Sequence, residues 1–92
     1  MKVYVNQTNL TLTLNAGMNL TSVSSALIKY IKPDLTRGSW TATADGLNVI
    51  YNINNGDLDQ SGKWIVWAEV TFTNNKISIG ESNYLQIYNV GE

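Results

Sequence analysis

The stretch GDLDQSGKWIVWAEVTF, residues 56–72, decides the fold of this chain. It begins with turn-forming residues, and from Gly62 onward the side chains alternate with a period of two, which is typical of a β-strand. One face would carry Trp64, Val66, Ala68, Val70 and Phe72, and the other would carry Ile65, Trp67, Glu69 and Thr71. We therefore predict a long strand here, with the Trp64 face in the core.

Shorter runs with the same period lie on both sides of this strand. They cover residues 10–14, 25–31, 39–43 and 47–53, and a last run from residue 77 to about residue 90 that breaks near Gly80. In the fourth run we expect Leu47, Val49, Tyr51 and Ile53 to share a face. Residues 15–27 are ambiguous, and residues 56–62 could form one helical turn. About seven short antiparallel strands separated by turn residues predict an all-β fold of the β-sandwich class.

Length and charge narrow the functional classes. The 92 residues suffice for one domain, spanning residues 1–92. Six basic residues against seven acidic ones give a net charge of −1, so there is no basic field to attract nucleic acid. The chain has no Cys, which excludes disulfides and thiolate metal sites. The first ten residues lack the apolar run of a signal or membrane span, so we expect no membrane partner.

Residues 56–64 predict a structural corner. In immunoglobulin-type sandwiches, an aromatic residue ties the turn before one central strand to the sheet. Gly62 and Trp64 reproduce the Gly-x-aromatic part of that corner, and Asp57 or Asp59 could cap the turn before it. Val66 would then occupy the position where antibody domains have a Cys. We interpret Asp57, Asp59, Gly62 and Trp64 as structural residues.

Three motifs support a more specific resemblance. They are KYIKPD at residues 29–34, Gly-x-Trp at residues 38–40, and GDLDQSGKW at residues 56–64. With the opening stretch from Val3 to Ala26, they resemble the immunoglobulin-like domain at the N-terminus of baseplate upper proteins of tailed bacteriophages and related prophage tail proteins. The resemblance covers nearly the whole chain. The baseplate upper proteins continue into further domains after this one, so the resemblance concerns their N-terminal domain alone.

This resemblance implies an immunoglobulin-like β-sandwich that serves as a non-enzymatic structural protein of a phage or prophage virion, made in the cytoplasm of the bacterial host. Its place in the baseplate, tail, neck or capsid surface stays open. Its partners would be other virion proteins or a second copy of itself. Because Ile65, Trp67 and Glu69 alternate out of the buried phase, we expect them to form the protein-contact face.

Other functional classes fit the residues less well. The chain has no His or Cys, and no Ser has a recognisable base partner, so we expect no catalytic residues and no cofactor. Asp57 and Asp59 lie in one turn rather than across a substrate groove. Calcium could use oxygens of residues 54–59, but the twelve-residue loop with its terminal Glu is missing, so we expect no metal site. The alternative function is a carbohydrate-binding module that uses exposed Trp67, Tyr84 and Tyr88.

Overall fold

The computed structural model describes residues 2–92, which form eight β-strands and no α-helix. The strands are β1 (Val3–Tyr4), β2 (Thr11–Asn15), β3 (Val23–Ile31), β4 (Arg37–Asp45), β5 (Asn48–Asn52), β6 (Gly62–Phe72), β7 (Ile77–Ile79) and β8 (Asn83–Tyr88). The prediction of an all-β fold is confirmed. No helix in this part of the chain is long and apolar enough to cross a membrane.

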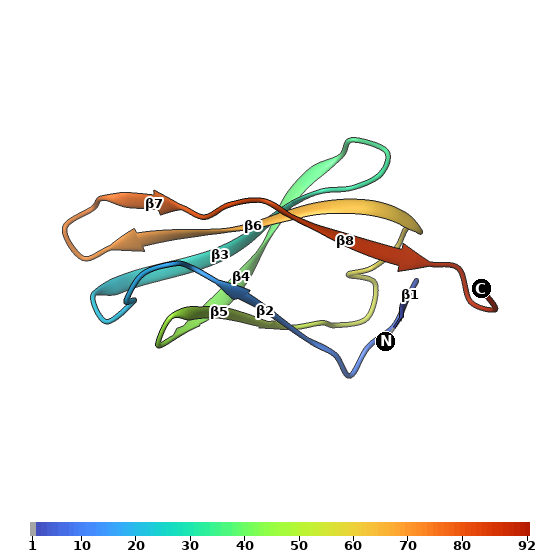
Figure 1. Cartoon of the computed structure of the whole chain (residues 1–92), viewed down its shortest axis with the longest axis horizontal. Coiled ribbons are helices and arrows are strands. Elements are labelled where there is room, and N and C mark those ends of the chain that lie inside the picture. Colours follow the sequence, from blue (N-terminus) through green and yellow to red (C-terminus); the bar gives the residue numbers. More distant parts are fainter. Residues whose placement is uncertain (1) are drawn as a thin grey trace.

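Hydrogen bonds join the strands in the order β1-β8-β6-β3-β4-β5-β2, and β7 pairs with β6 next to β8. The strand β4 links two layers, because residues 37–42 pair with β3 and residues 43–45 pair with β5. The sheet thereby curls over itself, so that β2 and β5 lie opposite β6 and β3 (Figure 1). The pairing of β1 with β8 is parallel.

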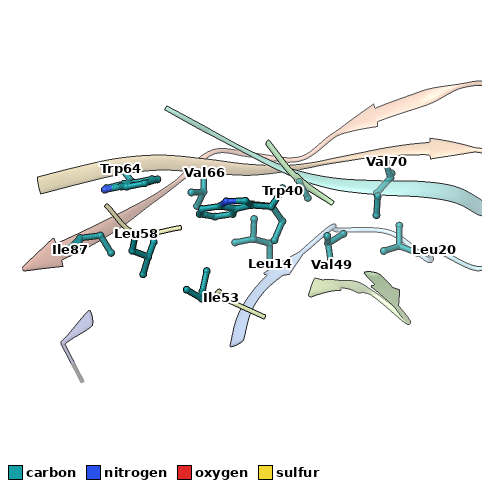
Figure 2. Close-up of a cluster of buried hydrophobic side chains, with 13 residues drawn as sticks. Leu14, Leu20, Trp40, Val49, Ile53, Leu58, Trp64, Val66, Val70 and Ile87 are labelled. Carbon is teal, nitrogen blue, oxygen red and sulfur yellow. The ribbon is translucent and has the colours of Figure 1, made fainter. Parts of the chain in front are cut away.

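The core fills the space between the two layers. Within residues 2–92 it contains thirteen buried apolar residues: Leu14, Leu20, Ala26, Ile28, Trp40, Val49, Ile53, Leu58, Trp64, Val66, Ala68, Val70 and Ile87. Figure 2 shows Trp64 and Val66 pointing from β6 toward Leu58 and Leu14 on the other side of this space. The even-numbered residues of β6 from Trp64 to Val70 are all buried, as the period of two predicts.

Several details differ from the sequence prediction. The fold has eight strands in place of about seven, and the pairing is not purely antiparallel. The strand around Trp40 spans nine residues, because it pairs first with β3 and then with β5. Leu47 lies in the turn before β5 and is 52% exposed, so it does not join the buried face of that strand. Residues 56–61 form turns and bends without a helical turn, and residues 15–27 contain a turn followed by the start of β3.

Candidate functional site

Trp64 is fully buried at the start of β6 and ties the preceding turn to the sheet. Its indole Nε1 donates a hydrogen bond to the Gln60 carbonyl oxygen, four residues earlier, at 3.0 Å. The ring packs against Tyr30 and Trp40, with centroid distances of 5.4 and 6.1 Å. The indole therefore has both its apolar ring and its polar nitrogen satisfied, as a buried Trp requires.

The motifs at residues 29–34 and 56–64 contact each other. Lys32 Nζ lies 2.9 Å from Asp59 Oδ2, and Gln60 Nε2 donates to Asp34 Oδ2 at 2.9 Å. The hydrogen bond to Asp59 raises the pKa of Lys32, although partial burial acts in the opposite direction. A hydrogen bond from the Thr36 backbone N–H is the main cause of a lowered pKa at Asp34. Residues from two distant motifs thus form one cluster, which we call the corner cluster: Lys32, Pro33, Asp34, Asp59, Gln60, Gly62 and Trp64.

Two glycines permit close contacts in and beside this cluster. Gly62 has a φ of 125°, and a Cβ atom there would lie 2.8 Å from the Cγ atom of Pro33. A Cβ atom at Gly38 would collide with the phenol of Tyr30. Gly is the residue that tolerates such a φ and such an approach. Gly38 and Gly62 therefore serve the packing of the corner, whereas a Cβ atom at Gly56 would meet nothing within 4 Å.

The two acids of the turn have different partners. Asp57 Oδ2 accepts hydrogen bonds from the Tyr51 hydroxyl and from the Asn54 backbone N–H, each at 2.7 Å. Burial, and secondly the hydrogen bond with Asp57, raise the pKa of Tyr51. Asp57 therefore ties the Tyr51 side chain and the Asn54 backbone to the turn. Asp59 instead turns its carboxylate to Lys32.

The two acids of the turn share no partner. Asp57 and Asp59 point to partners on different segments, Tyr51 and Asn54 in one case and Lys32 in the other. Within residues 2–92, no group of three or more His, Cys, Asp or Glu side chains gathers as a metal would require.

Ile65, Trp67 and Glu69 lie together on the face of β6 that points away from the core, and all three are half-buried. Their neighbours across β3 are Ile31, Lys29 and Leu27 in the same order. Lys29 Nζ lies 3.4 Å from Glu69 Oε2. We call this surface of β3, β4, β6, β7 and β8 the outer face.

An open groove of about 550 Å³ passes beside Trp67 on the outer face. Its lining is Lys29, Tyr30, Arg37, Gly38, Ser39, Trp67, Glu69 and Ile79. Arg37 lies in this groove because β4 pairs with β3, which places Arg37 opposite Ile31. Aromatic, aliphatic and charged groups therefore occur side by side around Trp67, a mixture that protein interfaces favour.

The three aromatic residues proposed for sugar binding differ in exposure. Tyr84 is 72% exposed, with Lys63 Nζ 4.5 Å from its ring centroid. Trp67 and Tyr88 lie outside the buried core but are half-buried. Tyr88 packs against Tyr4 with the ring planes tilted by 56°. The described residues thus place one of the three rings, Tyr84, fully at the surface.

Two features were missed by the sequence analysis. The first is a row of aromatic contacts inside the fold, in which Tyr51 stacks on Trp40 with a centroid distance of 5.1 Å and a 2° interplanar angle. The second is the exposure of Ile77 and Ile79 on β7, at 59% and 66%. The second feature has a signal in the sequence, since Ile-Ser-Ile follows a turn and carries no charge.

Comparison of this chain with models of protein families, with curated proteins and with solved structures found no match.

Proposed function

We propose that this chain is an immunoglobulin-like structural module of a tailed-phage or prophage particle, and that it binds another virion protein through its outer face. The protein has no enzymatic role in this proposal. The observation that carries it is the corner cluster, where the motifs of the phage resemblance contact one another through Lys32–Asp59 and Asp34–Gln60. Because the residues of the two motifs depend on one another for these contacts, they would be expected to occur together in one family of domains.

The strand order supports the immunoglobulin-like part of the proposal. Strands β8, β6 and β3 adjoin in the order of the G, F and C strands of an immunoglobulin sandwich. Strands β4, β5 and β2 adjoin in the order of D, E and B. Trp64 at the start of β6 bonds back to the turn before it, as the corner aromatic of that fold does.

The outer face supplies the contact surface. Trp67 is half-buried between Lys29 and the groove, so it is held in place and still accessible to a partner. Interfaces draw a large share of their binding energy from such Trp, Tyr and Arg anchors. Around Trp67, the outer face carries three basic residues, Lys29, Arg37 and Lys63, and one acidic residue, Glu69. We infer a partner surface that carries acidic groups around an apolar pocket.

The test is a Trp67→Ala variant in the phage or prophage that encodes this chain. The isolated variant should stay folded, because Trp67 lies outside the core, while its incorporation into particles should fall about tenfold or more. Ile50→Ala is the matched control, since Ile50 is half-buried on β5, in the other layer. Mass spectrometry of purified particles gives the copy number of each variant.

Two outcomes separate the parts of this proposal. If purified particles lack the wild-type protein, the virion role is wrong. If the protein is present and Trp67→Ala is incorporated as well as the wild type, only the outer face is wrong as the contact surface.

The alternative function, glycan binding, rests on Tyr84. An exposed ring beside the Lys63 ammonium could stack on a sugar ring. A glycan array with wild-type protein and a Tyr84→Ala variant tests it, because a glycan held by this ring would be lost with the side chain. Absence of binding by the wild-type protein would leave the structural role as the remaining proposal.

A further inference from the structure

The short strand β7 forms an open edge of the sheet. It pairs with β6 on one side only. By contrast, β1 covers the end of the neighbouring strand β8, where Val5 N–H donates to the Tyr88 carbonyl oxygen at 2.8 Å. β7 lies toward the end of the molecule opposite β1 and the C-terminus (Figure 1). The unpaired edge of β7 borders an open groove, which residues 13–18 line on the other side.

The hydrogen bonds flanking β7 show which backbone groups are free. Phe72 N–H donates to the Lys76 carbonyl oxygen, and Gly80 N–H donates to the Ala68 carbonyl oxygen, each at 2.8 Å. In an antiparallel pair, alternate residues direct both N–H and C=O to the same neighbour. The backbone N–H and C=O groups of Ser78 are therefore directed to β6. Those of Ile77 and Ile79 are directed outward, away from the sheet. Within residues 2–92, no other backbone segment pairs with these outward groups.

The side chains make this edge apolar. Ile77 and Ile79 point to the outer face and are 59% and 66% exposed. Residues 77–79 contain neither Pro nor a charged side chain, the common protections of edge strands. An unpaired edge of this kind is a template for another β-strand, because only an extended polypeptide matches its row of donors and acceptors.

We propose that β7 pairs in antiparallel fashion with β7 of a second copy of this chain, around a twofold axis at Ser78. This register places Ile77 of each copy opposite Ile79 of the other, with two hydrogen bonds in each of these pairs. The four Ile side chains then form a cross-strand cluster on the outer face. The same surface is used by both copies, as a twofold interface requires.

The charges at the two ends of β7 favour a second copy as the partner. Lys76 precedes the strand and Glu81 follows it, with only Gly80 between Ile79 and Glu81. Antiparallel pairing places Lys76 of one copy opposite Gly80 of the other, one residue from Glu81, at both ends, whereas in-register parallel pairing would bring like charges together. The edge is thus complementary to itself in charge as well as in hydrogen bonding.

The first test measures the association of the wild-type protein by sedimentation equilibrium over a wide concentration range. We expect a reversible dimer. Ile79→Thr keeps the β-branch and the N–H group but removes the apolar contact, and should weaken dimerisation about tenfold. Lys76→Glu and Glu81→Lys should each weaken it, and the double variant should restore it because the charges have exchanged places. Ile50→Ala, a change on β5 in the other layer, is the control and should leave the dimer unchanged.

The second test measures the register. The chain has no Cys, so a Ser78→Cys variant carries a single thiol. Facing residues in a non-hydrogen-bonded antiparallel pair have Cα atoms about 4.5 Å apart, which a disulfide can bridge. Ser78→Cys should therefore oxidise to a covalent dimer much faster than Ser39→Cys, a control thiol on the outer face of β4.

Either of two results would overturn the proposal. One is a protein that stays monomeric up to millimolar concentration, with Ser78→Cys oxidising no faster than Ser39→Cys. The other is a dimer that is insensitive to Ile79→Thr and to both charge reversals, because such a dimer uses another surface.

Discussion

The Trp64 indole contacts more of the fold than its place at the start of one strand suggests. It packs on Tyr30 from β3 and Trp40 from β4, and its nitrogen holds the Gln60 carbonyl. Removing the ring would leave a cavity and an unsatisfied carbonyl in the corner cluster. We expect Trp64→Ala to lower the free energy of unfolding by about 3–5 kcal/mol. Urea denaturation of the isolated domain measures this loss.

Trp64→Phe is the control for that variant. It keeps an aromatic ring in the same place and removes the hydrogen bond to Gln60, so its cost should be clearly smaller. A Trp64→Ala protein with the denaturation midpoint of the wild type would contradict the packing described for this residue.

The neighbouring acids Asp57 and Asp59 should differ in their effect on stability. Asp57→Ala removes the acceptor for the Tyr51 hydroxyl and the Asn54 N–H, which should cost about 1–3 kcal/mol. Asp59 pairs with Lys32 through a carboxylate that is 44% exposed, so Asp59→Ala should cost only about 0.2–1 kcal/mol. Thermal denaturation of the two variants at neutral pH compares them. Equal losses, or a larger loss for Asp59, would show that the turn is held differently.

Single residues differ in how far the sequence predicts them. The burial of Trp64 follows from the period of two around it, which is a local pattern. The partner of Asp59 is Lys32, 27 residues away, and no local rule connects the two. The same holds for the candidate contact face. The sequence placed Ile65, Trp67 and Glu69 on one side of a strand, but Lys29 and Ile79 joined them only through pairing with β3 and β7.

At the scale of the elements, β6 was predictable because its residues alternate in burial from Gly62 to Val70. The length of β4 could not be predicted. The alternation around Thr41 and Thr43 predicts a short strand, and it does not show which strands pair with it. Its length follows from pairing with two different strands. The parallel pair of β1 and β8 joins the two ends of the chain, and two residues are too few to produce a periodic signal.

Amide hydrogen exchange should show the difference between central and edge strands. Amides of β3 and β6 lie between two neighbours and should exchange slowest. In β7 we expect alternation at low protein concentration, with a slow amide at Ser78 and fast amides at Ile77 and Ile79. Exchange followed by NMR resolves these three amides. Equal protection of all three in a monomeric sample would mean that Ser78 is not the residue of β7 that is directed to β6.

At the scale of the whole molecule, β4 joins two layers that share one core. Leu14 and Val49 from β2 and β5 belong to the same buried cluster as Ile28 and Val66 from β3 and β6. Neither layer can bury its apolar face without the other. Most close contacts also join residues that are far apart in the sequence. A segment taken alone would therefore keep few of its contacts.

The two layers should therefore unfold together in a single transition. During urea denaturation, the fluorescence of Trp40 and Trp64 reports the core around β4 and β6, and far-ultraviolet circular dichroism reports all the strands. Both signals should give the same midpoint and the same dependence on urea, as expected for one cooperative domain. The test is best done with a protein that carries Trp67→Phe, so that the tryptophan on the outer face does not contribute. Two separate midpoints would mean that β2 and β5 can detach while β3, β6 and β8 stay folded, and that residues 1–92 do not behave as a single domain.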